Sequence, residues 1–428
     1  MSLRRGACPA LSAPMQTGDG LLVRLATAGA SLSPQQLVAL CGAAERHGNG
    51  LVEITARGNF QIRGLTPDSA TALATDIAAM KLGLRDGVPV ETNPLAGLDP
   101  TEIANPAPLA SAIRDAIDAT DLKDHLAPKV TVVVDGGGRI GLRNVAADIR
   151  FDALGQAEWL VSIGGDASTA QALGRCAGKD ATTVTCRLLE RIAETGSDAR
   201  GRNVVTEAAH DALGRLVGPL QAPAPRRMPA RPFGNIPLAG IRFAFGVGLP
   251  FGQITAGELS TFVKAVEANG ADEFRMSPGR ALLVLRTGCR DAIADIANAA
   301  RLVTNANDPR ARIFACPGSD GCASGYIPAR QIAASVADEL AGNAADFSLH
   351  ISGCPKGCAH PAPASLTLVG KEEGPILVQN GSARGTGIPF GNHNVAVRLA
   401  DALRIRSSTN DQPEVRRKPH PAHAFAGD

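Results

Sequence analysis

The chain has 428 residues, of which 44% are hydrophobic and 20% charged, and its formal net charge is +2. This length suits about two to four domains, and the composition is not that of a disordered or nucleic-acid-coating protein. Aromatic residues are scarce, and no apolar run reaches the roughly 20 residues of a membrane span. The sequence therefore predicts a soluble, cytoplasmic protein that binds neither nucleic acid nor membrane.

The first predicted elements are a strand and a capped helix. Residues 20–26 are typical of a strand, with Arg24 inside it. Ser33 is a favoured N-cap residue, Pro34 suits the first helical position, and apolar residues follow at helical spacing. A second strand is predicted from the β-branched run at 130–135.

A glycine-rich string follows the predicted strand at 130–135. Gly136, Gly138 and Gly141 spell G-x-G-x-x-G, which in dinucleotide-binding proteins opens a helix. Here residues 148–151 have a strand-like pattern instead, matching 365–368 farther along the chain. We therefore expect no nucleotide at this loop and an external electron donor.

The chain contains two related copies of these elements. Residues 33–55 align without a gap with a later segment at an offset of 222, which places Thr255 where the first copy has Ser33. The strand at 240–245 contains Arg242, as the first contains Arg24, and residues 347–352 match 130–135 at an offset of 217. Each copy is therefore predicted to hold two α/β units.

A proline-rich segment separates the copies, and a polar segment ends the chain. Residues 214–240 favour extended chain because proline cannot continue a helix, so we predict a connector there. Residues 407–428 are predicted to form a mobile tail.

Four of the nine cysteines form two pairs. Cys316 and Cys322 are separated by five residues, and Cys354 and Cys358 by three. The glycine- and proline-rich loops around them would let four thiolates face one point, as a 4Fe-4S cluster requires. Zinc is the structural alternative, although its cysteine pairs usually lie about two to four residues apart. The other five stand alone and are typical of small buried residues: Cys8, Cys41, Cys176, Cys186 and Cys289.

Only one cluster is expected, although the chain is duplicated. At the offset of 217, Cys354 and Cys358 fall on Gly137 and Gly141. The first copy therefore lacks thiols where the second has them.

The cysteine spacing, the two copies and the string ITARGNFQIRG at 54–64 resemble the sirohaem-dependent sulfite and nitrite reductase superfamily. The string RRGACPALSAPMQTGDGLLVRL and PLAGLDP at 94–100 resemble its oxygen-dependent branch in aerobic cobalamin biosynthesis. The resemblance implies an α+β fold with pseudo-twofold duplication, in which two ferredoxin-like half-domains join two α/β domains. The implied boundaries are 1–85 and 241–305 for the half-domains, 86–213 and 306–406 for the α/β domains, 214–240 for the linker and 407–428 for the tail.

The same resemblance implies an oxygen-dependent monooxygenase. Its tetrapyrrole substrate, precorrin-3A, would be hydroxylated with lactone formation by a peripheral acetate. The implied cofactors are the 4Fe-4S cluster and a mononuclear non-haem iron, and the implied partners are dioxygen and an external NAD(P)H-linked electron donor. No catalytic residue or iron ligand is assigned, since His360, the histidine nearest the cysteines in sequence, is more typical of a supporting or surface residue.

Binding a tetrapyrrole edged with carboxylates requires basic side chains, and arginine binds carboxylates bidentately. The resemblance places the family's anion-handling arginine at Arg57. Each candidate has the alternative of a solvated surface charge. The further candidates come from both copies: Arg24, Arg63, Lys129, Arg242, Arg275 and Arg280.

Two departures from the reductases weaken the case for sulfite or nitrite as substrate. Lys129 matches the first of two active-site lysines, but Thr131 stands at the second position, and Pro94 and Leu95 stand where another basic residue is expected. A sirohaem reductase, in which the cysteine matching Cys358 also links the cluster to sirohaem iron, stays an alternative. A structural zinc protein or an iron–sulfur redox sensor is the non-enzyme alternative.

Overall fold

The computed structural model describes residues 9–27, 31–84, 87–219, 230–240, 242–287, 291–342 and 347–410. Two compact units make up the chain: residues 1–311 with 321–323 form the first, and residues 312–320 with 324–428 form the second. The predicted domain boundaries are finer than this division and stay a prediction. Most of the predicted tail and the middle of the predicted connector lie outside the described residues.

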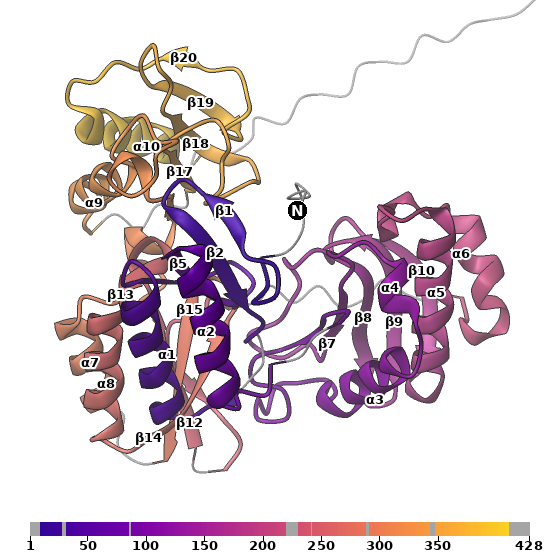
Figure 1. The fold of residues 1–428 in the computed structure, drawn as a ribbon. Helices are drawn as coiled ribbons and strands as arrows, with labels where there is room; N and C mark the ends of the chain where they lie inside the picture. Colours follow the sequence, from indigo (N-terminus) through magenta and orange to yellow (C-terminus); the bar gives the residue numbers. More distant parts are fainter. Residues whose placement is uncertain are drawn as a thin grey trace, which may run out of the picture. The chain divides into compact units, whose positions relative to one another are not determined.

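The described residues form four five-stranded sheets, three of them in the first unit (Figure 1). The first sheet is antiparallel and is covered by helices α1 (Pro34–His47) and α2 (Pro67–Ala79). Its strands, in spatial order, are β1 (Met15–Thr17), β2 (Gly20–Leu25), β5 (Phe60–Leu65), β4 (Leu51–Ile54) and β13 (Gln253–Thr255).

The second sheet has the same topology in the second copy. Helices α7 (Ala256–Glu267) and α8 (Asp291–Ala299) accompany it. Its strands, in spatial order, are β11 (Gly234–Pro237), β12 (Arg242–Gly248), β15 (Ala281–Thr287), β14 (Ala271–Ser277) and β3 (Ser31–Leu32).

Each of these two sheets receives one edge strand from the other copy. β13 pairs with β4, so that Gln253 lies opposite Glu53, and β3 pairs with β14, so that Ser31 lies opposite Arg275. These pairs are related by the predicted offset of 222. Helices α1 and α7 lie side by side (Figure 1), and apolar residues of both copies form one shared core.

The predicted helix starts are confirmed in both copies. The Ser33 side chain accepts a hydrogen bond from the Gln36 backbone N–H, and the Gln36 side chain accepts one from the Ser33 N–H. Thr255 and Glu258 form the same reciprocal pair at the start of α7. Such a capping box satisfies backbone donors that a helix start leaves without partners.

The third sheet belongs to the first α/β part of the chain. β6, β7 and β8 run parallel, and β9 and β10 extend the sheet antiparallel. The glycine-rich loop runs from the end of β7 to a strand and not to a helix, which confirms the strand-like pattern of residues 148–151. The elements are β6 (Val90–Thr92), α3 (Ala107–Asp118), α4 (Leu122–His125), β7 (Val132–Asp135), β8 (Ala147–Gly155), β9 (Glu158–Gly165), β10 (Gln171–Ala177), α5 (Ala181–Thr195) and α6 (Thr206–Leu213).

The fourth sheet forms the second unit and repeats this pattern. Strands β16, β17 and β18 are parallel, and β19 and β20 follow antiparallel. The elements are β16 (Ile313–Ala315), α9 (Ala329–Glu339), β17 (Leu349–Ser352), β18 (Ala364–Val369), β19 (Ile376–Gly381), β20 (Ile388–Pro389) and α10 (Val395–Asn410). Across the described ranges, no helix combines the length and apolar character needed to cross a bilayer.

Two predicted irregular segments contain regular structure. Residues Gly234–Pro237 of the predicted connector form the edge strand β11, where proline is tolerated because one side of an edge strand needs no donor. The first residues of the predicted tail continue helix α10 as far as Asn410.

Candidate functional site

Two of the four paired cysteines lie at the carboxyl ends of neighbouring parallel strands in the second unit. Cys316 directly follows β16, and Cys354 lies two residues after β17. Parallel strands place their carboxyl ends at the same edge of a sheet. The backbone N–H of Gly353 donates a hydrogen bond to Sγ of Cys316 at 3.1 Å. Hydrogen bonds of this kind tune the reduction potential of an iron–sulfur cluster.

The loops that carry these cysteines pack backbone against backbone. A Cβ added to Gly353 would lie 2.9 Å from the Cα of Gly318, 3.3 Å from Sγ of Cys316 and 3.4 Å from the Cα of Gly325. A Cβ on Gly325 would lie 2.5 Å from the backbone of Gly318 and Ser319. Glycine at these positions therefore allows the two loops to approach each other.

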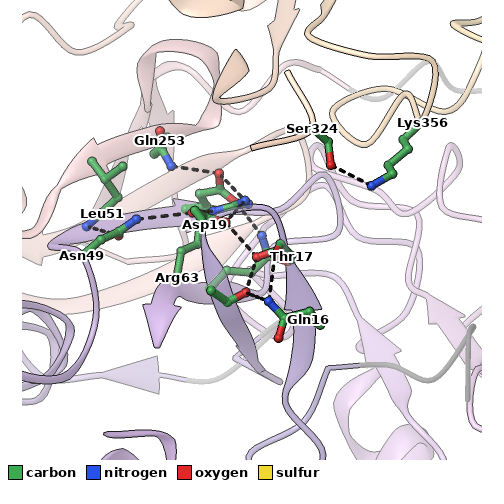
Figure 2. A network of polar contacts seen from close by, with 12 residues as sticks. Gln16, Thr17, Asp19, Asn49, Leu51, Arg63, Gln253, Ser324 and Lys356 are labelled. Carbon is green, nitrogen blue, oxygen red and sulfur yellow. Dashed lines mark hydrogen bonds and ion pairs between the residues drawn. The ribbon is translucent and has the colours of Figure 1, made fainter. Parts of the chain in front are cut away.

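The paired cysteines differ in their surroundings. Cys354 is buried, Cys316 is half-buried and Cys358 is exposed, while Cys322 lies in the 321–323 segment that groups with the first unit. The loop between Cys354 and Cys358 is tied by Lys356, whose Nζ donates to Oγ of Ser324 at 3.0 Å (Figure 2).

The chemistry of these loops fits a cluster. None of the seven described cysteines forms a disulfide, and thiolates with N–H donors beside them are the ligands of iron–sulfur centres. Within the described ranges, however, no three His, Cys, Asp or Glu side chains form a group that could hold a metal ion. The loops that carry Cys316 and Cys354 lie together in the second unit, and the cluster and the mononuclear iron stay predictions.

The ring of His360 takes part in aromatic packing. It stacks on Phe314 of β16 with centroids 4.2 Å apart and meets the ring of His350 edge-on at 5.8 Å. This position suits the supporting role that the sequence favours.

The first copy closes its equivalent loops without sulfur. Asn93 directly follows β6, as Cys316 follows β16, and its Oδ1 accepts a hydrogen bond from the Gly136 N–H at 2.7 Å. Gly136 matches Gly353 at the offset of 217, so the same backbone donor binds an amide oxygen in one copy and a sulfur in the other. The first copy therefore lacks a thiol at the position of Cys316 as well as at those of Cys354 and Cys358.

Carboxylates hold this first-copy loop. Asp135 is buried and accepts hydrogen bonds from the backbone of Gly137 and Leu142 and from Nδ2 of Asn93, at 2.7 to 2.9 Å. Burial, together with the charges of Asp99 and Asp135, raises the pKa of Glu102 to about 7, against a hydrogen bond from the Gly97 N–H. The sequence reasoning missed these residues, although Asn93 and Asp99 stand 223 positions before Cys316 and Cys322.

Four of the seven predicted substrate-binding residues form ion pairs with carboxylates of the chain. Nη1 of Arg57 lies 3.2 Å from Glu91. Arg242 and Arg275 both pair with Glu273, at 3.2 and 2.5 Å, and Nη1 of Arg275 donates to the Pro94 carbonyl at 3.0 Å.

Arg63 forms the fourth ion pair, inside a network that both copies share (Figure 2). Its guanidinium binds Asp19 bidentately at 2.9 Å and Glu53 at 3.3 Å. Glu53 also accepts hydrogen bonds from Gln253 of the other copy at 3.0 Å and from Gln61 at 2.6 Å. The Gln61 amide oxygen accepts from Nε and Nη2 of Arg24 at 2.9 and 2.7 Å.

The last two candidates have different settings. Lys129 is exposed, three residues before β7. Arg280 lies in the turn between β14 and β15 with φ of 64°, and its side chain packs on Gly252. The substrate-binding role of all seven residues stays a prediction. Sequence reasoning missed the carboxylate partners: Glu91 and Asp19 lie far along the chain from Arg57 and Arg63, and Glu273 shares strand β14 with Arg275.

Comparisons with known proteins identify relatives over most of the chain. Residues 13–80 match the nitrite/sulfite reductase ferredoxin-like half domain. A precorrin-3B synthase of Sinorhizobium sp is 41% identical over 92% of this chain and 86% of that protein. A ferredoxin–nitrite reductase of Synechococcus elongatus is 26% identical over 83% of this chain and 77% of that protein. The solved structure of Mycobacterium tuberculosis NirA shares the fold, with a TM-score of 0.72 and 20% identity over 93% of this chain and 82% of that one.

Proposed function

Because the chain belongs to the precorrin-3B synthase family, enzymes built on the nitrite/sulfite reductase fold, we propose that it converts precorrin-3A into precorrin-3B as an oxygen-dependent monooxygenase. One oxygen atom of dioxygen enters the macrocycle and the other leaves as water. An external NAD(P)H-linked donor supplies the electrons and solvent supplies the protons. The observation that carries this proposal is the 41% identity to a precorrin-3B synthase over 92% of the chain.

The proposed cofactors are a 4Fe-4S cluster held by Cys316, Cys322, Cys354 and Cys358 and a mononuclear non-haem iron. Bound there, they would supply electron transfer and oxygen activation, which protein side chains do not provide. The chain itself contributes thiolate ligands at adjoining strand ends and the Gly353 N–H, which donates to the Cys316 sulfur.

The chain also contributes a set of basic residues for the peripheral carboxylates of the substrate. Arg57 is the principal candidate, because 35% of its side chain stays accessible although it is paired with Glu91. Bidentate contacts from such arginines would fix the orientation of the macrocycle. Further candidates are Arg24, Arg63, Lys129, Arg242, Arg275 and Arg280.

The two departures from the reductases have structural counterparts that favour the synthase. Leu95 is 1% exposed and packs in an apolar cluster with Ile140 and Leu283, a setting in which a basic residue would be costly. Thr131 is buried, and its N–H donates to Asp148. Neither position offers a cation for sulfite or nitrite.

The test is an iron, acid-labile sulfide and zinc assay on anaerobically purified protein, together with its visible spectrum. The proposal expects iron and sulfide in the assay and a broad shoulder in the visible spectrum. Intense sirohaem bands in the spectrum would support a reductase. Zinc without sulfide would support a structural protein. Replacing Cys316, Cys322, Cys354 or Cys358 by Ser should lower the iron and sulfide content. Cys186→Ser is the matched control, since this half-exposed thiol lies on α5.

Activity is tested with precorrin-3A and isotope-labelled dioxygen. The proposal expects oxygen uptake and one labelled oxygen in the product. Product without label would contradict the monooxygenase, even if the cluster assay succeeds.

A further inference from the structure

Arg57 is held by the neighbouring α/β sheet. It lies in the turn between β4 and β5, and its Nη1 donates to both carboxylate oxygens of Glu91 on β6, at 3.2 and 3.3 Å. Its Nη2 donates to the backbone carbonyl of Ala146, the residue before β8. Two nitrogens of the guanidinium are thus fixed by a residue of β6 and by the residue that precedes β8 in the same sheet.

The two partners of this ion pair differ in exposure. The side chain of Glu91 is 11% exposed, whereas that of Arg57 is 35% exposed. Glu91 is therefore the more buried partner of the pair, and the Arg57 side chain keeps access to solvent. Guanidinium has five N–H donors, and Nε of Arg57 donates to no residue in the described ranges.

Burial and the contact with Arg57 act in opposite directions on Glu91. Burial raises the pKa of its carboxyl, and the charge and hydrogen bonds of Arg57 oppose that rise. Arg114 of α3 reaches the same strand, where its Nη2 donates to the Val90 carbonyl at 3.4 Å. Within the described residues, the charge that acts on the pKa of Glu91 is therefore that of Arg57.

We propose that Glu91 is the positioning residue for Arg57: together with the Ala146 carbonyl it fixes the plane of the guanidinium, so that the remaining N–H groups meet one peripheral carboxylate of a tetrapyrrole in a single orientation. This inference rests on the proposed function, because it takes a tetrapyrrole carboxylate as the ligand of Arg57. An arginine that is pre-oriented loses less conformational entropy when it binds, so affinity rises without a further contact.

A competing role for Glu91 gives the opposite sign. If Glu91 and the ligand carboxylate competed for Arg57, removing the charge of Glu91 would strengthen binding. If Glu91 positions Arg57, removing that charge weakens binding. A protonated glutamate resembles glutamine in shape and charge. Lowering the pH and replacing Glu91 by Gln must therefore change the binding affinity in the same direction.

The experiment measures binding of uroporphyrin, an air-stable tetrapyrrole with acetate and propionate groups, by fluorescence quenching in the purified full-length protein. At pH 8, Glu91→Gln should weaken binding about tenfold, the effect of one charged hydrogen bond. The difference from the unsubstituted protein should vanish as the pH falls through the pKa of Glu91, at a higher pH than for an ordinary glutamate. A variant that merely folds less well would bind less at every pH. It would not reach the affinity of the unsubstituted protein as the pH falls.

Three variants make the result interpretable. Arg57→Gln should abolish the effect of Glu91→Gln, since the glutamate acts through the arginine. Glu91→Asp keeps the charge with a shorter reach and should bind with intermediate affinity and retained pH dependence. Glu158→Gln is the matched control, because it breaks a pair with Arg175 in the same sheet and should change nothing.

The outcomes separate the inference from the function on which it rests. Equal affinities of the unsubstituted protein and Glu91→Gln at every pH, or tighter binding by Glu91→Gln, would overturn the positioning role and leave the tetrapyrrole substrate standing. Failure of the unsubstituted protein to bind uroporphyrin at any pH would count against the tetrapyrrole function itself, and the inference would go with it.

Discussion

The Gly353 N–H donates to Sγ of Cys316 at 3.1 Å, and the Gly136 N–H donates to Oδ1 of Asn93 at 2.7 Å in the corresponding place of the first copy. One backbone geometry thus serves two different acceptors. In the second copy the acceptor is the Cys316 sulfur, a soft ligand that suits iron. In the first copy it is the Asn93 amide oxygen, which completes a hydrogen-bond network.

Gly353→Ala should lower the cluster content. Its Cβ would lie 2.9 Å from Gly318 and 3.3 Å from the Cys316 sulfur, so the two loops must separate, at a cost of about 1–3 kcal/mol. The measurement is iron and acid-labile sulfide per chain after anaerobic purification. Gly155→Ala is the control, because nothing lies within 4 Å of the added Cβ there. Full cluster content in Gly353→Ala would show that the close approach is unnecessary.

Arg63→Ala should destabilise the first unit strongly. The side chains of Arg63 and Asp19 are 10% and 8% exposed, and removing the arginine leaves buried carboxylates without their cation, at a cost of about 3 kcal/mol. The measurement is the free energy of unfolding in urea. Arg46→Ala, which breaks the exposed pair with Asp76, should cost much less, because solvent screens that pair.

The loss in Arg63→Ala should depend on pH. Burial opposes ionisation of Asp19, but hydrogen bonds from Arg63 and Thr17 outweigh it and lower the pKa of the carboxyl. A lowered pKa contributes stability above the unfolded-state pKa, and this contribution disappears as the pH falls through the folded-state pKa. The difference between Arg63→Ala and the unsubstituted protein should therefore shrink in acid. A difference that stays constant down to acid unfolding would contradict the ion-pair account.

Glu102→Gln should stabilise the protein at alkaline pH. Burial and the nearby carboxylates raise the pKa of Glu102 to about 7, so between the ordinary glutamate pKa and pH 7 the folded state holds a proton that the unfolded state releases. Stability then falls as the pH rises through this window, by on the order of 1 kcal/mol after screening. Thermal midpoints at pH 5 and 8 measure the effect, with the exposed Glu372→Gln as control. If the thermal midpoints of Glu102→Gln and the unsubstituted protein differed equally at pH 5 and pH 8, the prediction would be wrong.

Truncation at Leu220 should leave neither half folded and active. The first half alone would lack β13 beside β4, and the second would lack β3 beside β14. Protection of backbone amides from hydrogen exchange and activity of each fragment measure this. Mixing the two fragments should restore both signals. Activity of the isolated C-terminal fragment would contradict a shared architecture.

Much of the fold could be predicted because its signals are local. Ser33 and Thr255 are favoured N-cap residues, and each precedes the helix that it predicts. The β-branched run that ends at Asp135 forms the predicted strand. The pattern of 148–151 predicts a strand after the glycines, and β8 forms there.

Other features depend on contacts that no local pattern carries. β3 has two residues and β13 three, too few for any periodicity, so their exchange between sheets was not predicted. The sequence offers the basic residues as candidates by their charge alone, and the acidic partner of Arg57 lies 34 positions away and belongs to a different sheet. Asn93 could have been found by extending the repeat alignment to the loop after β6.

The oxygen-based closure of the first copy has a consequence for the loss of iron. Asn93 and Asp135 hold the loops after β6 and β7 through amide and carboxylate oxygens, whereas the loops after β16 and β17 meet at the sulfur of Cys316. If the proposed cluster is bound, loss of its iron would change the surroundings of Cys316 and Cys354 and leave the contacts of Asn93 and Asp135 unchanged.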